Sequence, residues 1–158
     1  MKNQVVVDKS LPKNLPLLIK DRAWNYGDYI CQRARNKDGK YTNYTYKETY
    51  SDILAFAIAM QEIGVQRGSH VGLIADNRRE WLVTDLALLS LGAADVPRGC
   101  DTMSTEICYI LDYADCLHSF FENGKQLEKL FDNAVTAPNV KTAILFDAAS
   151  EETLEKAK

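Results

Sequence analysis

Apolar residues recur at a helical period over residues 46–60. Five of them stand four and three positions apart and share one stripe of a helix: Tyr46, Tyr50, Ile53, Ala57 and Met60. Thr45 precedes this stripe, and Glu48 follows Thr45 at the Ser/Thr-x-x-Glu spacing of a capping box. Gly64 supplies a natural stop. The pattern predicts a helix that begins at Tyr46 and ends before Gly64.

Short apolar runs alternate with helical patterns through the rest of the chain. Four runs, each typical of a strand, cover residues 70–75, 93–96, 117–121 and 142–146. Their spacing leaves room for one helix in each interval, which favours consecutive βα units with parallel pairing and right-handed crossovers. The predicted fold class is therefore α/β, with a mostly parallel, doubly wound sheet and helices on both of its faces.

The helices in these intervals have recognisable ends or stripes. Asn77 is the predicted N-cap of a helix that starts at Arg78 and ends at Gly92, and Pro97 is expected to close the strand that follows. A second helix is predicted over residues 105–114. A third is expected on the apolar stripe of Leu127, Leu130, Phe131 and Ala134.

The two ends of the chain differ from this regular middle. Residues 11–16 contain two prolines and predict an irregular arm, whereas residues 29–35 and 41–45 flank an Asp-Gly turn signal and predict a short β-hairpin. We therefore divide the chain into an arm with a hairpin, residues 1–45, and an α/β subdomain, residues 46–158. A helix predicted from Ser150 has only about two turns before the last residue, so this subdomain is expected to be incomplete.

Composition narrows the class of protein. The 158 residues are 46% hydrophobic and suit one globular unit, and the formal net charge of −3 disfavours a nucleic-acid-binding protein. Only Val5, Val6 and Val7 are apolar near the start, so no secretory signal is predicted. The longest apolar run, Ile53–Met60, is far shorter than the ~20 residues of a membrane-spanning helix. We expect a cytoplasmic protein that at most touches the inner face of a membrane.

The cysteines and histidines do not form a recognisable site. Four cysteines without a Cys-x-x-Cys pair predict reduced thiols; they are Cys31, Cys100, Cys108 and Cys116. The last three, with His118, could be offered as metal ligands, but their spacing is not that of a structural zinc site and favours small buried hydrophobic residues. His70 and His118 are expected to be hydrogen-bonded structural residues. We predict no metal ligand and no catalytic residue.

Acidic residues follow or approach the ends of several predicted strands. Asp76, Asp95 and Asp147 stand where open α/β sheets bind ligands, and such acids can hold Mg²⁺ or accept a phosphoryl group, as in receiver domains. Aspartate is also favoured in the turns that follow strands, and this turn chemistry is the favoured interpretation. Asp85 lies in an otherwise apolar helix and needs a hydrogen-bonding partner if it is buried.

The loop after the second predicted strand is the most unusual local feature. Pro97 fixes φ, Gly99 permits close approach of the backbone, and Arg98 places a permanent charge at the end of a strand. Such a loop either carries a binding site or is held by an ion pair of Arg98 with Asp101 or Asp95. Neither a Walker loop nor a Gly-x-Gly-x-x-Gly motif occurs in the sequence.

Two stretches, Asp76-Asn77-Arg78-Arg79-Glu80-Trp81 and Leu89 to Thr102, resemble the amino-terminal portion of long-chain fatty-acyl-CoA synthetases, which belong to the AMP-binding, adenylate-forming superfamily. A third, Tyr44-Thr45-Tyr46-Lys47-Glu48, resembles the Thr-Tyr-x-Glu element that opens the first long helix of that superfamily. The resemblance extends from about Leu15 to Phe146. It departs at Thr49-Tyr50, where the superfamily more often has an acidic residue followed by Leu.

The resemblance implies a two-step ligase that uses ATP, Mg²⁺ and coenzyme A to activate a long-chain fatty acid. It also implies that the phosphate loop, the adenine-binding segment, the ribose-binding acid and the mobile lysine lie beyond Lys158, so this segment alone is expected to bind no cofactor and to be inactive. The candidates for the substrate rim are Arg98, Gly99, Cys100, Asp101 and Thr102. The expected partners are the fatty acid and the downstream subdomains, with room for a membrane contact or a homodimer.

Two alternatives stay open at this point. One is a non-catalytic module that acts by protein contact or acyl-chain binding, which predicts a sealed surface or a homo-oligomer. The other is a receiver-like Mg²⁺-binding phosphoacceptor, which requires the strand-end acids to cluster. A segment of a larger ligase instead predicts an apolar patch that is left exposed.

Overall fold

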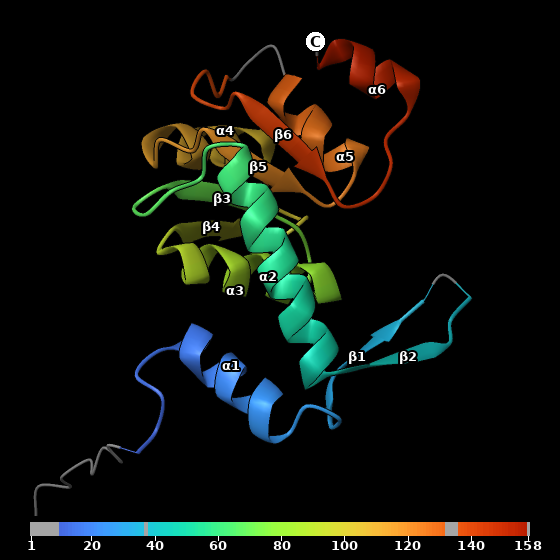
Figure 1. Cartoon of the computed structure of the whole chain (residues 1–158). Coiled ribbons are helices and arrows are strands. Elements are labelled where there is room, and N and C mark those ends of the chain that lie inside the picture. The colour runs from blue at the N-terminus through green and yellow to red at the C-terminus, as the bar shows by residue number, and fades with distance from the viewer. Residues whose placement is uncertain (1–9, 37, 132–135, 158) are drawn as a thin grey trace, which may run out of the picture. The chain divides into compact units, whose positions relative to one another are not determined.

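The computed structural model describes residues 10–36, 38–131 and 136–157 (Figure 1). The predicted roles of Val5 to Val7 and Ala134 fall outside these residues. The elements, in chain order, are α1 (Leu15–Asn25), β1 (Ile30–Arg35), β2 (Tyr41–Thr45), α2 (Tyr46–Glu62), β3 (His70–Ile74), α3 (Arg79–Leu91), β4 (Ala94–Arg98), α4 (Ser104–Tyr113), β5 (His118–Phe121), α5 (Gly124–Leu127), the 3₁₀ helix η1 (Glu128–Phe131), β6 (Thr142–Leu145) and α6 (Glu151–Lys156).

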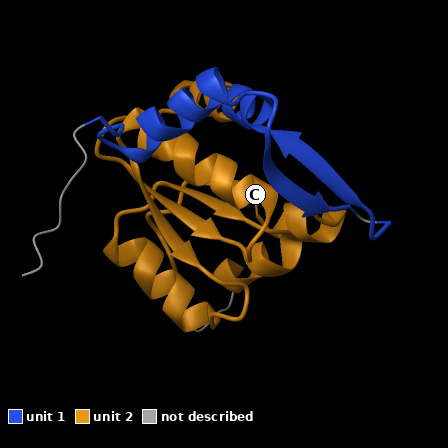
Figure 2. Ribbon diagram, turned by 90° about the horizontal axis from the view of Figure 1, so that it is seen from below, with its two compact units in different colours: residues 1–52 blue, residues 53–158 orange. Residues whose placement is uncertain are grey.

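The chain divides into two compact units, residues 1–52 and residues 53–158 (Figure 2). The division falls inside α2, whereas the predicted boundary at residues 45 and 46 lies at the start of that helix. The predicted domain boundary stays a prediction. No helix within the described residues is long and apolar enough to cross a bilayer.

The amino-terminal unit contains a helix where the sequence predicted an irregular arm. Asn14 caps α1, since its Oδ1 accepts a hydrogen bond from the backbone N–H of Leu17 at 2.9 Å. Pro16 lies in the first turn, where the missing N–H has no partner to lose. The prediction was wrong because it took the two prolines only as breakers of regular structure.

The predicted hairpin and capping box are both confirmed. Strands β1 and β2 pair antiparallel, and Gly39 in the turn adopts a φ of +79°. At the start of α2 the backbone N–H of Thr45 donates to Oε2 of Glu48 at 2.8 Å. The N–H of Glu48 donates in return to Oγ1 of Thr45 at 3.2 Å. This reciprocal pair fixes the first turn of the helix.

The second unit holds a four-stranded sheet in the order β4-β3-β5-β6, in which every pair is parallel. The chain leaves β3 toward β4 on one side and then crosses to β5 on the other. The strand order therefore reverses at β3, and the loops after β3, β4 and β5 meet at one edge. In open α/β sheets, ligands bind at such a switch point.

Helices cover both faces of this sheet, as predicted. On β3, Leu73 packs into a core with Leu88 of α3, whereas its neighbour Ile74 packs on the opposite face with Leu111 of α4. The same alternation holds on β5, where consecutive phenylalanines belong to different cores. A parallel sheet needs cover on both faces, and the mainly apolar runs of β3 and β5 reflect that.

Two predicted boundaries shift in the structure. Strand β4 continues through Pro97 to Arg98, although Pro97 was expected to close it. Within the described sheet β4 is an edge strand, which tolerates a residue without an N–H. The third predicted helix is split into α5 and the 3₁₀ helix η1. By contrast, Gly92 ends α3 at a φ of +74°, and Ser150 caps α6, both as predicted.

Gly72 in the middle of β3 is required by the close approach of its neighbours. A Cβ at this position would lie 2.9 Å from the Cβ of Ser119 on β5 and would also overlap the Leu111 side chain of α4. Both neighbours are fully buried, so neither has free space to move into. The contact between α4 and the sheet therefore depends on the missing side chain.

We expect Gly72→Ala to lower the free energy of unfolding by about 1–3 kcal/mol, because one added methyl group overpacks this site. Urea denaturation measures the loss. Adding Ser119→Gly to Gly72→Ala moves the Cβ from one strand to the other and should restore part of the stability. Equal stability of Gly72→Ala and the wild type would contradict the close packing described.

Candidate functional site

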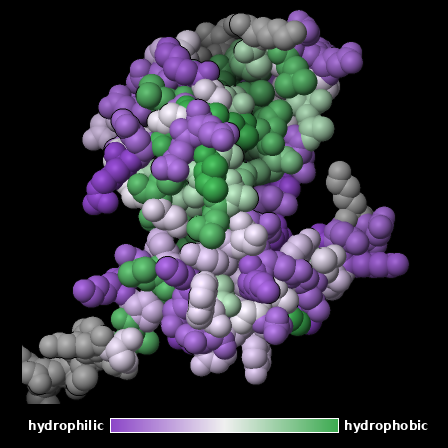
Figure 3. Space-filling model, in the orientation of Figure 1, coloured by the Kyte–Doolittle hydropathy of each residue, from purple (hydrophilic) through white to green (hydrophobic). Residues whose placement is uncertain are grey.

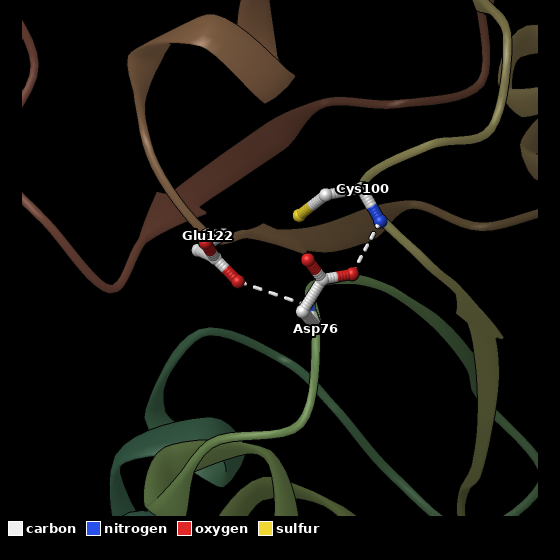
Figure 4. Close-up of side chains that lie close together, drawn as sticks. All are labelled: Asp76, Cys100 and Glu122. Carbon is white, nitrogen blue, oxygen red and sulfur yellow. Dashed lines mark hydrogen bonds between the residues drawn. The ribbon is translucent and has the colours of Figure 1, made fainter. Parts of the chain in front are cut away.

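The loops that follow β3, β4 and β5 bring Asp76, Cys100 and Glu122 together (Figure 4). Potential ligand atoms of the three side chains all lie within 4.8 Å of one another. Two of the residues, Asp76 and Cys100, were singled out in the sequence; Glu122 was not. The group stands at the point where the strand order reverses, which makes it the candidate site of this fold.

Backbone hydrogen bonds already engage both carboxylates of the group. The N–H of Cys100 donates to Oδ1 of Asp76 at 2.8 Å, and the N–H of Asp76 donates to Oε2 of Glu122 at 2.9 Å (Figure 4). Each carboxylate therefore satisfies a main-chain donor in a neighbouring loop. The three loops are joined by these bonds, which gives the group a structural role.

The donor set does not suit the Mg²⁺ that the resemblance implies. Mg²⁺ takes oxygen ligands in octahedral geometry, whereas one of the three groups here is a thiol. Burial, and then the nearby Glu122 carboxylate, raise the pKa of the Cys100 thiol to about 11. The thiol therefore stays protonated at neutral pH and is a poor ligand. Asp76, Cys100 and Glu122 therefore do not fit a magnesium site.

The other cysteines and the histidines follow the predictions in part. Cys108 and Cys116 are buried in the core, as expected of small hydrophobic residues, but Cys100 is partly exposed in its loop. His70 is a structural residue, with Nδ1 lying 2.8 Å from the carbonyl oxygen of Ala114. Nδ1 of His118 is buried without a hydrogen-bond partner among the described residues, so the prediction was wrong for this histidine.

The loop of the rim candidates, Arg98 to Thr102, is held from outside. Nζ of Lys129 donates to the carbonyl oxygens of Cys100 and Thr102, each at 2.7 Å. The guanidinium of Arg98 lies 3.5 Å from a carboxylate oxygen of Glu106. The expected ion pair of Arg98 with Asp101 or Asp95 was therefore wrong: α4, which follows the loop, supplies the partner.

The strand-end acids are dispersed. Asp76 belongs to the group described above, Asp147 follows β6, and Asp95 lies near the start of β4 rather than at its end. A receiver-like phosphoacceptor needs its acids in one cluster. The structure does not bring these three together, so that alternative loses its geometric basis.

Asp147 forms a forked ion pair with Arg78. Its two oxygens accept hydrogen bonds from Nη1 and Nη2 of Arg78 at 2.9 and 3.2 Å, the geometry of a forked pair. Nε of the same arginine donates to Glu80 at 2.8 Å, and its guanidinium lies 5.3 Å from the ring centre of Phe146. The hydrogen bond with Asp147 is the largest influence on the pKa of Arg78 and raises it.

The N-cap of α3 differs from the one that the sequence predicted. Arg78, not Asn77, occupies the N-cap position of α3, and no side chain caps the helix there. The arginine at the cap reaches Asp147 across 69 positions of sequence, and it joins the loop after β3 to the end of β6. Local motif spacing carries no signal for a pair so far apart.

Comparison with known proteins adds the context of a family. A profile described as "AMP-binding enzyme" matches residues 19–158. The chloroplastic long-chain-fatty-acid–[acyl-carrier-protein] ligase AEE15 of Arabidopsis thaliana is 26% identical over 133 residues, which are 84% of this chain and 18% of that protein. The long-chain-fatty-acid–CoA ligase FadD15 of Mycobacterium tuberculosis is 24% identical over 82% of this chain and 21% of its own length.

Solved structures show the same fold. The inhibitor-bound N-terminal domain of FACL13 from Mycobacterium tuberculosis superposes with a TM-score of 0.72 at 18% sequence identity, over 92% of this chain and 35% of that one. The chain spans about a fifth of the length of the curated relatives that it matches.

Asp76 is predicted to matter as a hydrogen-bond acceptor rather than as a charge. Asp76→Ala leaves the N–H of Cys100 without its acceptor, and we expect a loss of about 1–3 kcal/mol in the free energy of unfolding. Asp76→Asn keeps an acceptor oxygen and should lose clearly less. Urea denaturation of both variants decides the point, and equal losses would contradict a role based on the acceptor.

Asp85 lies close to a second carboxyl group. Its half-buried side chain, on α3, interacts with that of Asp95 near the start of β4. Burial and then the charge of Asp95 raise the pKa of Asp85 from 3.8 to about 6. The folded protein therefore holds this proton more tightly than the unfolded chain does.

The stability from this proton is full below the unfolded pKa of 3.8 and is lost as pH rises through about 6. We expect Asp85→Asn to flatten the fall in stability over that interval and to be more stable than the wild type at pH 7. Thermal unfolding between pH 4 and pH 7 measures this. Glu62→Gln, on the exposed side of α2, is the control and should keep the wild-type slope; an unchanged slope in Asp85→Asn would refute the pairing.

Proposed function

The chain belongs to the AMP-binding enzyme family, and we propose that it forms the amino-terminal segment of a ligase that joins long-chain fatty acids to coenzyme A. The observation that carries this proposal is the family match over residues 19–158. The names of the relatives support the fatty acid as the substrate class. The fold, shared with an N-terminal domain, supports the position of the segment in the longer enzyme.

The proposed reaction of the whole enzyme has two steps. A carboxylate oxygen of the fatty acid attacks the α-phosphorus of ATP, and the bond to pyrophosphate breaks to leave acyl-adenylate. The thiol sulfur of coenzyme A then attacks the acyl carbon, AMP leaves, and the thiol proton passes to a base or to solvent. Magnesium would spread the phosphate charge during the first step. No residue of this chain is assigned a step of this reaction, because those of the candidate site do not fit Mg²⁺.

The proposed contribution of this segment is a scaffold. The Asp76 group and the Arg78–Asp147 pair hold the loops at the carboxyl edge of the sheet in place. Arg98 to Thr102 remain candidates for the substrate rim on this edge. In the structure Arg98 pairs with Glu106. A role of this loop at the substrate stays a prediction.

Exposed apolar side chains support docking of further parts of a longer polypeptide. On α2, Leu54 and Ile58 stand one turn apart and keep 43% and 58% of their surfaces exposed. Figure 3 shows apolar surface gathered over the unit of residues 53–158. A self-contained interaction module predicts a sealed surface, or a homo-oligomer that covers the exposed side chains. The exposed apolar side chains argue against the sealed surface, and the family match over residues 19–158 favours the segment of a ligase.

We expect the 158 residues alone to release no pyrophosphate above background when they are mixed with a long-chain fatty acid, ATP, Mg²⁺ and coenzyme A. The reason is that the chain lacks a recognisable phosphate-binding loop. A coupled pyrophosphate assay measures this, with full-length FadD15 as the positive control. Turnover that depends on the fatty acid would show that the catalytic groups lie within this chain.

A further inference from the structure

The outward face of α4 carries two tyrosines that stack on each other. Tyr109 and Tyr113 stand one turn apart, with 5.7 Å between their ring centres and 21° between the ring planes. They keep 65% and 78% of their surfaces exposed, whereas Ile107 and Leu111 on the inward side of the helix are buried in the core. The two rings therefore contribute little to the packing of α4 on the sheet, and their stacking orders them before any partner binds.

Acidic side chains share this face of the helix. Glu106 stands three positions before Tyr109 and Asp112 three positions after it, and α4 contains no Lys or Arg. Nε of Arg98 lies 3.5 Å from Oε1 of Glu106, whereas no cation among the described residues pairs with Asp112. Oδ1 of Asp112 is buried and accepts no hydrogen bond within the described part of the chain. A cation that reaches this carboxylate would supply the compensation that the fold does not.

The unit around α4 is acidic as a whole. Residues 53–158 contain nine Lys and Arg against sixteen Asp and Glu, a net charge of −7. Asp115, two positions after the end of α4, adds a charge near the end of the helix, and its Oδ1 accepts a hydrogen bond from the neutral amide of Asn139 at 3.3 Å. This charge attracts a basic partner, and salt weakens the attraction.

The protein itself shows how an aromatic ring and a neighbouring carboxylate hold an arginine together. The guanidinium of Arg78 lies 5.3 Å from the ring centre of Phe146 and donates to both oxygens of the next residue, Asp147. A guanidinium stacks on an aromatic ring and fits a carboxylate with two N–H groups, which the ammonium of lysine does not do. Asp112 and Tyr113 offer the same two groups in adjacent positions, and no arginine of the described residues takes that place.

We propose that the α4 face formed by Glu106, Tyr109, Asp112 and Tyr113 binds an extended, arginine-containing segment of a partner protein. One guanidinium stacks on the exposed tyrosine rings and another pairs with the carboxylate of Asp112. Ordered tyrosines of this kind are common anchors of protein interfaces. The inference goes beyond the proposed ligase function and does not rest on it, because it requires neither substrate nor turnover.

Fluorescence anisotropy with a labelled Arg-Gly repeat peptide tests the proposal on the 158-residue chain. We expect saturable binding at low salt, severalfold weaker binding of a Lys-Gly repeat of equal length, and release as salt is raised. Tyr109→Ala with Tyr113→Ala should weaken binding about tenfold, because each cation–π contact at an exposed site contributes roughly two- to fivefold. Tyr109→Phe with Tyr113→Phe keeps the rings and should bind almost as the wild type does. Tyr29→Ala with Tyr41→Ala, two exposed tyrosines of residues 1–52, is the control and should change binding little.

A charge variant separates the carboxylate from the rings. Asp112→Asn should weaken binding of the Arg-Gly peptide about threefold, whereas Asp28→Asn removes the same charge from an exposed residue of the other unit and should not. No binding at low salt, equal binding of the arginine and lysine peptides, or full binding by the Tyr→Ala pair would overturn the proposal. So would sedimentation that shows self-association lost in Tyr109→Ala with Tyr113→Ala, because a second copy would then occupy this face. None of these outcomes depends on the ligase assay, so the two proposals fail independently.

Discussion

The central strand β3 must satisfy two sheet neighbours and two helical layers at once. Val71, Leu73 and Ile74 are fully buried, and their side chains alternate between the core formed with α2 and α3 and the core formed with α4. Gly72 completes the strand because α4 and β5 leave no room for a side chain there. With β3 fixed in this way, the loops after β3, β4 and β5 have to meet at one edge of the sheet, which is where Asp76, Cys100 and Glu122 gather.

At that edge the charged groups are used within the protein. Asp76 and Glu122 each accept a backbone N–H from a neighbouring loop, Asp147 is engaged by Arg78, and Lys129 holds the loop after β4. These hydrogen bonds tie the loops together, and they leave little free charge with which to bind the phosphates of a nucleotide. The geometry supports the proposal that this segment acts as a scaffold.

Much of the fold was predictable because its signals are local. The period of α2, the capping box of Thr45 and Glu48, the turn at Gly39 and the stop at Gly92 each depend on residues a few positions apart. The errors arose where a distant group decides the outcome. The N-cap of α3 is Arg78 and not Asn77, and the partner of Arg78 is the distant Asp147. Glu122 lies at the candidate site because of the register of β5 beside β3. For Pro97, the decisive fact was the edge position of β4, which spacing alone does not reveal.

We propose that this chain supplies a scaffold and not the nucleotide site. This proposal is tested most directly by titrating the 158 residues with a non-hydrolysable acyl-adenylate and following the backbone amide resonances. If the segment is a scaffold, we expect no saturable shifts at the amides of Asp76, Cys100 and Glu122, whose loops are already held by internal hydrogen bonds. Saturable shifts confined to these amides would contradict it, because they would place a nucleotide-binding site within this chain.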